Sequence, residues 1–227
     1  MDFDSFVLAA STADLTDEPT AREHADAIEY RMDLADEPLA ALEAYDDGDG
    51  ELPILATNRA AWEGGEWSGN DERRLAVLAE ATAIDAVEAI DIELEAILAG
   101  DADELLETAR ERDVAVVASA HDFEGTPTRG ELVSTLTEAH KYADVAKMAV
   151  TAESHKDTLA VLAATEQLTA HGDPVATMAM GELGSHTRAV APVYGSKIGY
   201  APVDPENATA PGQYDLETLS KLVSELS

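Results

Sequence analysis

The chain has 227 residues and 45% of them are hydrophobic, which allows one sizeable core but is short for two domains. Its 47 acidic and 14 basic residues give a formal net charge of −33, which excludes nucleic acid and anionic membrane surfaces as partners because both require clustered lysine and arginine. There is no cysteine, so disulfides, thiolate nucleophiles and cysteine-based zinc sites are excluded as well.

Short apolar runs alternate with longer segments of helical periodicity along the chain. Eight runs predict β-strands: Phe6–Ser11, Ala27–Leu34, Leu52–Arg59, Ala86–Leu94, Val114–Asp122, Val145–Ala152, Pro174–Gly181 and Ala189–Ser196. Six segments predict helices: Glu37–Tyr45, Asp71–Ala83, Ala102–Arg112, Arg129–Tyr142, Ser154–Ala170 and Leu216–Leu226. Asp71, Asp101 and Thr128 are predicted helix N-caps, and Glu131 completes a capping box with Thr128.

Eight strands separated by helices predict an α/β fold, an eight-stranded parallel β/α (TIM) barrel formed by a single domain over residues 1–227. An open doubly wound sheet also alternates, but it usually has fewer strands and a glycine-rich phosphate turn, and neither GxGxxG nor GxxxxGKS/T occurs here. The first residues lack the basic and apolar regions of a signal peptide, and no apolar run approaches the ~20 residues of a membrane helix. We therefore expect a cytoplasmic protein.

Acidic residues are spread over the whole sequence, and lysine occurs only five times. Such a surface repels itself at low ionic strength, so we expect a protein adapted to concentrated salt, from an extreme halophile. The alternative is a non-catalytic acidic cation-binding protein, for which Asp46–Glu51 (DDGDGE) is the candidate segment. Aligned as an EF-hand loop on Gly50, this segment has Tyr45 at the first ligand position and Ala56 at the last, so a solvated turn is favoured.

Charged side chains share faces of the predicted strands near their C-terminal ends. Because residues two apart in a strand point to the same side, the sequence groups Glu29 with Arg31 and Asp33, Thr57 with Arg59, and Asp91 with Glu93. Each group alone fits a solvated strand end or a structural ion pair. Together at the C-terminal mouth of a barrel, where barrel enzymes build their active sites, they predict a site.

Two reactive side chains occur on the next predicted strands. His121 ends the fifth strand, and Lys147 interrupts an otherwise apolar sixth strand. Lys147 fits either a side chain that reaches water from a strand end or a buried amine whose pKa, ordinarily ~10.4, is lowered until it attacks a carbonyl. The scarcity of lysine favours the second interpretation. No histidine pair has metal-ligand spacing, so we expect no metal.

Eight motifs, in this order, carry a resemblance to a known family: EYRMDL, TNRAAWEGGE, IDIEL, SAHDFEGTP, ADVAKMAV, MAMGELGSHTR, YGSKIGYAP and ATAPGQ. In order and spacing they resemble the type I 3-dehydroquinate dehydratases of the shikimate pathway, over Glu29 to Gln213. The resemblance implies an eight-stranded β/α barrel, a homodimer, and a cofactor-free syn elimination of water that converts 3-dehydroquinate to 3-dehydroshikimate.

The resemblance also implies roles for individual residues. Lys147 would form an imine with the substrate ketone, and His121 would remove the neighbouring proton and return one to the departing hydroxyl. Glu63 would orient or tune His121. Substrate binding would fall to six further residues, with Arg188 on the carboxylate and Gln213 on a closing loop: Glu29, Arg31, Arg59, Arg188, Thr209 and Gln213.

Two positions depart from the family pattern: Thr209 stands where serine is common, and Tyr200 where phenylalanine is frequent. The match near the first strand is poor and leaves open whether Ser11 touches substrate. Another Schiff-base barrel lyase of the class I aldolase type would share the sixth-strand lysine, but it would not need SAHDF followed by the TR and APGQ motifs.

Overall fold

The computed structural model describes residues 1–204 and 212–226, so Thr209 lies outside the described residues. Eight parallel strands form its centre: β1 (Val7–Thr12), β2 (Ala27–Arg31), β3 (Ile54–Thr57), β4 (Val87–Glu93), β5 (Ala115–Asp122), β6 (Val145–Thr151), β7 (Val175–Met180) and β8 (Ile198–Pro202). They are hydrogen-bonded in the order β7-β6-β5-β4-β3-β2-β1-β8, which confirms the predicted α/β barrel.

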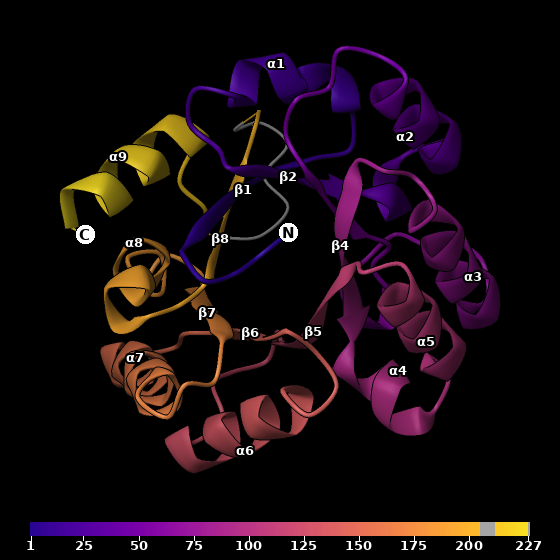
Figure 1. Ribbon diagram of the computed structural model, residues 1–227. Coiled ribbons are helices and arrows are strands. Elements are labelled where there is room, and N and C mark those ends of the chain that lie inside the picture. Colours follow the sequence, from indigo (N-terminus) through magenta and orange to yellow (C-terminus); the bar gives the residue numbers. More distant parts are fainter. Residues whose placement is uncertain (205–211, 227) are drawn as a thin grey trace.

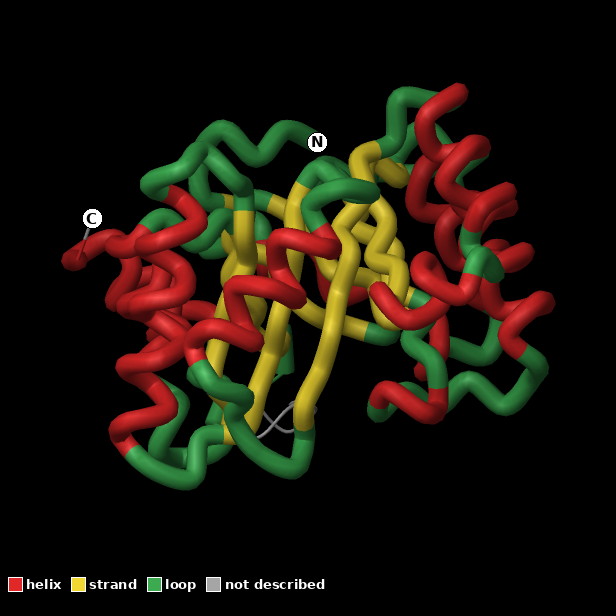
Figure 2. Tube along the Cα trace, turned by 90° about the horizontal axis from the view of Figure 1, so that it is seen from below, coloured by secondary structure: helices red, strands yellow, loops and turns green. Residues whose placement is uncertain are grey.

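Helices surround the strands (Figure 1). They are α1 (Glu18–Ala21), α2 (Pro38–Asp46), α3 (Asp71–Ala81), α4 (Leu94–Ala99), α5 (Asp103–Glu111), α6 (Arg129–Ala139), α7 (His155–Thr169), α8 (Thr187–Val190) and α9 (Leu216–Leu226). Figure 2 shows the strands from the side, inside this helical layer. Within the described ranges, no helix has the length and apolarity that crossing a membrane would require.

One predicted strand is wrong. The run Ala189–Ser196 does not form the eighth strand; it lies in α8 and in a 3₁₀ turn over Ala191–Tyr194. Pro192 lacks the N–H that a strand inside a sheet must donate, and it suits the first turn of a helix instead. Gly195 ends that turn with a φ of 95°, and the chain then enters β8 at Ile198.

The remaining differences concern strand ends and helices. β2 ends at Arg31, so Asp33 lies in a 3₁₀ turn over Met32–Leu34 and not on the predicted strand, and β3 ends at Thr57. Thr128 caps α6 with the predicted capping box to Glu131. Asn70 caps α3 in place of Asp71, because its side chain accepts from the amide of Arg73 at 2.9 Å. Ala102, and not Asp101, precedes α5. Helix α4 was not predicted, because its apolar Leu94–Ala99 follows directly on a buried strand and gives no separate signal.

The strand side chains alternate between two buried layers. One layer fills the space between strands and helices and includes Ile28 and Tyr30 of β2 and Ile90 of β4. The other fills the inside of the barrel, with small residues such as Ala27 of β2 and Ala89 of β4. Polar residues continue the inward row toward the C-terminal strand ends, and this alternation places them in the barrel mouth.

The barrel closes between β7 and β8 at their N-terminal ends. The amide of Lys197 donates to the carbonyl of Val175 at 2.7 Å. The amide of Thr177 donates to the Ser196 hydroxyl at 3.1 Å, and this serine is buried. A side chain therefore completes the seam where the eighth strand meets the seventh.

Candidate active site

Polar side chains from the strands of the barrel meet in one cavity of about 80 Å³. Eight of the nine site residues predicted from the sequence line it: Glu29, Arg31, Arg59, Glu63, His121, Lys147, Arg188 and Gln213. The ninth, Thr209, lies outside the described residues. The apolar part of the cavity wall is formed by Phe123, Ala149, Met178, Met180 and Tyr200.

Lys147 of β6 is buried, with 5% of its surface exposed. Its Nζ donates to Oδ2 of Asp91 at 2.8 Å and lies 4.4 Å from the centroid of the Tyr200 ring. Burial alone would raise the pKa of the Asp91 carboxyl, but Arg59 and Lys147 hold it well below its usual range. A permanently ionised carboxylate therefore lies beside the lysine nitrogen, where it stabilises positive charge.

Arg59, which follows β3, connects the acidic side chains of the cavity. Its Nη2 donates to Oδ1 of Asp91 at 2.8 Å, and its Nη1 donates to the Ser119 hydroxyl at 2.7 Å and to Glu93 at 3.1 Å. The same Nη1 contacts Glu63 at 3.2 Å. Despite its burial, these carboxylates raise the pKa of Arg59, so it is a fixed positive charge.

His121 at the end of β5 pairs with Glu63. Its Nδ1 lies 2.9 Å from Oε2 of Glu63, and its ring stacks on Phe123 with centroids 5.8 Å apart. Burial, followed by the charges of Arg59 and Lys147, lowers the pKa of His121 well below 6.5, so the ring is neutral at neutral pH. Burial raises the pKa of Glu63 to about 7, although Arg59 opposes this shift. With Nδ1 engaged, Nε2 is the ring nitrogen left to act on a ligand.

Glu29 and Arg31 line the opposite side of the cavity on β2. Ser11 donates to one carboxylate oxygen of Glu29 and Thr57 to the other, at 2.5 and 3.3 Å. In this structure Ser11 thus contacts a predicted binding residue. Arg31 makes a two-pronged ion pair with Asp33, with distances of 2.9 and 2.7 Å.

Arg188 of α8 is different from the other cavity arginines. It is buried, and its Nε and Nη2 have no hydrogen-bond partner among residues 1–204 and 212–226. Its Nη1 lies 3.6 Å from the Met178 sulfur. Burial lowers the pKa of Arg188 to about 10, with Glu29 opposing, so the guanidinium is still charged at neutral pH. A buried guanidinium with such donors is suited to bind an anion, and its fork matches the geometry of a carboxylate.

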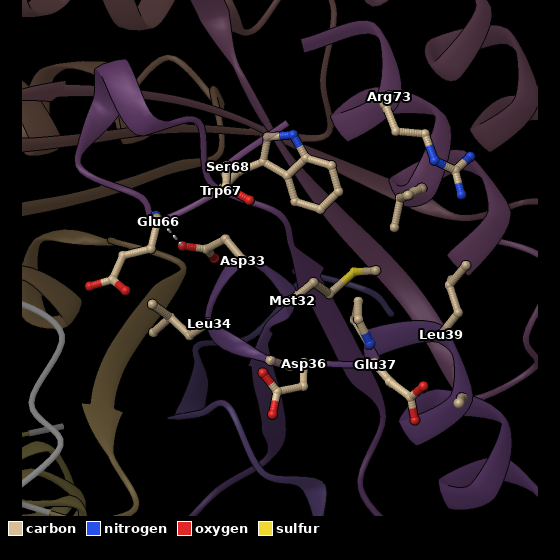
Figure 3. A pocket seen from close by; sticks show the side chains of 14 residues that line it. Met32, Asp33, Leu34, Asp36, Glu37, Leu39, Glu66, Trp67, Ser68 and Arg73 are labelled. Atoms are coloured by element: carbon tan, nitrogen blue, oxygen red, sulfur yellow. Dashed lines mark hydrogen bonds between the residues drawn. The ribbon is translucent and has the colours of Figure 1, made fainter. Parts of the chain in front are cut away.

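A larger hollow, about 620 Å³, lies beside α2 and α3 (Figure 3). Its lining contains neither lysine nor histidine, and it carries Asp33, Asp36, Glu37 and Glu66. Figure 3 shows the backbone amide of Glu66 donating to Asp33, at 3.1 Å. The hollow therefore borders the Arg31–Asp33 pair from outside, and the reactive groups are all in the smaller cavity.

Sequence reasoning missed two parts of this arrangement. Ser119 lies on the inward row of β5, two residues before His121, so the alternation that grouped the other strand residues could have identified it. Arg74 contacts the site from α3, and nothing in a helical sequence indicates such a contact. Within the described ranges, no group of three or more histidine, aspartate or glutamate side chains is arranged to hold a metal ion.

Residues 6–227 match the family model of the type I 3-dehydroquinases. The chain is 58% identical to a 3-dehydroquinate dehydratase of Haloarcula marismortui, over 100% of this chain and 98% of the relative. It is 51% identical to that of Halobacterium salinarum, over 100% of both.

Solved structures agree with these relatives. The 3-dehydroquinate dehydratase of Geobacillus kaustophilus superposes with a TM-score of 0.87 at 29% identity, covering 98% of this chain and 91% of the other. The type I enzyme of Clostridium difficile, solved with covalently modified comenic acid, gives 0.86 at 27% identity, covering 98% and 92%. From its sequence, its fold and its site, this chain belongs to the type I 3-dehydroquinases, which are lyases.

Proposed function

We propose that the protein dehydrates 3-dehydroquinate to 3-dehydroshikimate by syn elimination, through an imine on Lys147, as a step of the shikimate pathway. One observation carries the proposal: a buried lysine, a neutral histidine and an arginine with donors that lack a partner among residues 1–204 and 212–226 line the same small cavity. The substrate has a ketone for the lysine, an acidifiable C–H bond for the histidine and a carboxylate for the arginine.

The first steps place the ketone on the lysine. Lys147 as a neutral amine attacks the carbonyl carbon, and loss of that oxygen as water leaves an imine. Once protonated, the imine is an electron sink that acidifies the adjacent C–H bond. The ionised carboxylate of Asp91, 2.8 Å from Nζ, stabilises the positive nitrogen.

Elimination then uses His121 twice. Nε2 of the neutral ring takes the proton from carbon, and the electron pair moves through the enamine toward the imine nitrogen. The enamine expels the hydroxyl group on the next carbon, and His121 returns the proton to it, so that water leaves. Because one group removes the proton and protonates the leaving group, both lie on the same face of the ring, which is the reason for a syn course. Water then hydrolyses the conjugated iminium and frees Lys147.

Other residues bind and orient. Arg188 would take the substrate carboxylate with the donors that have no partner among the described residues. Glu29 and Arg31 would contact ring hydroxyls, and Glu63 would hold the His121 ring through Nδ1. Gln213 lines the cavity from the segment after β8, in line with the role that the resemblance gives it, and Thr209 stays a prediction from the sequence.

The experiment is reduction with borohydride in the presence of 3-dehydroquinate. We expect a mass increase on the peptide that contains Lys147, dependent on substrate and absent from Lys147→Ala. The Clostridium difficile relative was solved with covalently modified comenic acid, which supports covalent chemistry in this family. Formation of the conjugated product is followed by its absorbance. Labelling on another peptide, or turnover by Lys147→Ala at the wild-type rate, would refute the mechanism.

Substrate carrying deuterium at one of the two positions of the acidic carbon tests the stereochemistry. Syn elimination removes the hydrogen on the face of the departing hydroxyl, and loss of the other one contradicts the role of His121.

The homodimer and the cytoplasmic location also stay predictions. Light scattering in concentrated salt tests the first, and fractionation of the source cells tests the second.

A further inference from the structure

Another buried arginine lies directly behind the proposed active site. Arg74 of α3 is fully buried, with 0% of its surface exposed, and it does not line the cavity. Its Nε donates to Asp71 at 2.8 Å, and its Nη1 donates to the carbonyl of Asn58 at 2.9 Å. The same Nη1 donates to Oε2 of Glu93 at 2.7 Å. Burying a guanidinium costs desolvation free energy, so we asked what its contacts do for the site.

Glu93 connects Arg74 to the catalytic cavity. Arg74 occupies Oε2 of this carboxylate, and the other oxygen, Oε1, accepts from the amide of Ala60 at 2.9 Å and from Arg59 at 3.1 Å. Arg59 in turn holds Asp91, which holds Lys147 at 2.8 Å. Alternating charges thus run without a break from α3 to the nitrogen that is to form the imine.

Basic and acidic side chains alternate along this path. Glu93 lies between Arg74 and Arg59, Asp91 lies between Arg59 and Lys147, and Arg59 also contacts Glu63. Without Arg74, Glu93 would be a buried carboxylate with half its pairing lost, and it would attract Arg59 more strongly. Arg59 would then move away from Asp91 and Glu63, whose contacts it now makes with separate nitrogens.

We propose that Arg74 is a positioning residue for the dehydration: by holding Oε2 of Glu93, it fixes Arg59 between Asp91 and the Glu63–His121 pair. It adds one positive charge behind the cavity, and it holds Arg59 in one position through Glu93. The proposal rests on the proposed function, because it concerns the rate of that reaction. It predicts an effect on the chemical step and its pH dependence, and little effect on substrate affinity, because Arg188 lies elsewhere in the cavity.

The test compares Arg74→Met, Arg74→Lys and Arg73→Met. Arg73 is a matched control, because it is the next residue of the same helix, is half-exposed and pairs only with the exposed Glu80 among the described residues. We expect Arg74→Met to lower kcat about 10–100-fold with KM within about threefold, as a small displacement of catalytic groups does. Arg73→Met should behave as wild type.

The pH–rate profile separates charge from geometry. The charged groups that contact Arg74 are Asp71 and Glu93, and the path continues to Arg59 and Asp91. The cavity lining adds Glu63, His121 and Lys147. Loss of one positive charge makes protons harder to remove there, so the limbs for Arg74→Met should move about one pH unit upward. Arg74→Lys keeps the charge but lacks the fork, so we expect the wild-type profile with a reduced kcat.

Borohydride labelling counts the competent sites, so that kcat is expressed per folded molecule. Should Arg74→Met fail to fold, Arg74→Lys decides: a lowered kcat with unchanged pH limbs supports the proposal, and a wild-type kcat overturns it. Wild-type kcat and pH limbs in a folded Arg74→Met also overturn it. These outcomes differ from failure of the proposed function, in which the wild-type protein itself gives no adduct at Lys147.

Discussion

Arg188 and Arg31 are both buried arginines of the cavity, but their surroundings suit them to different roles. Arg31 has a carboxylate partner in Asp33, so its charge is neutralised within the protein. Arg188 is as deeply buried, but its Nε and Nη2 find no partner in the part of the chain that the structure describes. A buried donor without a partner costs stability, and a ligand that accepts from it would offset that cost.

Replacement of Arg188 by methionine should therefore stabilise the free protein and weaken substrate binding. We expect the free energy of unfolding to rise by about 1–3 kcal/mol, because an unpartnered buried polar group is removed. The KM should rise about 100-fold, because a charge-assisted, two-pronged contact is lost. Urea unfolding and initial rates in concentrated salt measure the two effects. Arg129→Met, at an exposed position, is the control. A less stable Arg188→Met with unchanged KM would contradict the assignment.

Glu63 makes stability depend on pH. Its pKa rises from 4.5 to about 7 on burial, so the folded state holds this proton more tightly than the unfolded state. The contribution of Glu63 to stability is then fully present below pH 4.5 and is lost as the pH rises through about 7. The lowered pKa of His121 affects stability in the opposite direction. A comparison of wild type with Glu63→Gln isolates Glu63, because both proteins contain His121.

Glu63→Gln removes this titration. Between pH 5 and pH 8 we expect the wild-type protein to lose about 1–3 kcal/mol of unfolding free energy relative to the glutamine variant. Urea titrations at both values and constant salt measure the difference. Glu66→Gln, an exposed neighbour in the same loop, should parallel wild type. Parallel curves for Glu63→Gln as well would show that Glu63 keeps an ordinary pKa.

At the scale of elements, the sequence predicted most of the fold, and the errors have physical causes. Seven of the eight predicted strands overlap observed ones, because β1 to β7 are short, mostly buried runs bounded by polar segments. The eighth failed because a short apolar run with Pro192 fits a helical turn as well as a strand, and Gly199 weakened the signal of the true strand. Strand alternation also predicted that Glu29 and Arg31 share the cavity, but it was wrong for Asp33, which follows β2 in a 3₁₀ turn and lines the larger hollow.

The packing of helices against the site was beyond prediction. Period-two alternation groups residues within one strand, and parallel order brings neighbouring strands together, so Glu29 and Asp91 could be assigned to the mouth. The contact of Arg74 with Glu93 depends on how α3 lies against β4, which no local pattern of the sequence contains. The family motifs supplied the roles of Lys147 and His121, and the structure supplied their partners.

The seam between β7 and β8 gives a prediction about elements. Ser196 is buried, and its hydroxyl accepts from the Thr177 amide at 3.1 Å where the barrel closes. Ser196→Ala leaves that amide without its partner, so we expect a loss of about 1–3 kcal/mol in unfolding free energy. Faster hydrogen exchange at Thr177 should accompany it. Ser5→Ala, exposed at the same end of the barrel, should change neither quantity. An unaltered exchange rate in Ser196→Ala would show that the seam does not depend on this hydroxyl.

At the scale of the whole molecule, a strongly negative surface encloses a cavity built around cations. The net charge of −33 repels an anionic substrate at long range, whereas Arg188, whose Nε and Nη2 have no partner among the described residues, attracts it at short range. Salt screens distant surface charge much more than buried charge. The relatives with the highest identity reported above come from Haloarcula marismortui and Halobacterium salinarum, which are halophilic archaea.

Stability should therefore increase with salt concentration through screening of surface repulsion. Helix α5 offers a direct test, because its exposed Glu104, Glu107 and Glu111 follow each other at spacings of three and four residues. All three carboxylates belong to the acidic surface whose self-repulsion salt screens. Replacing all three by lysine adds six charge units and changes the net charge from −33 to −27.

We expect the lysine variant to remain folded at a lower salt concentration than wild type, and the two proteins to converge toward 1 M salt, where the screening length is only ~3 Å. Circular dichroism over a series of KCl concentrations gives the folding midpoints, and turnover of 3-dehydroquinate should fall along the same curve. Replacement of the three glutamates by glutamine separates charge removal from charge reversal, and its midpoint should lie between the other two. Equal midpoints for all three proteins would mean that salt acts on something other than repulsion at this surface.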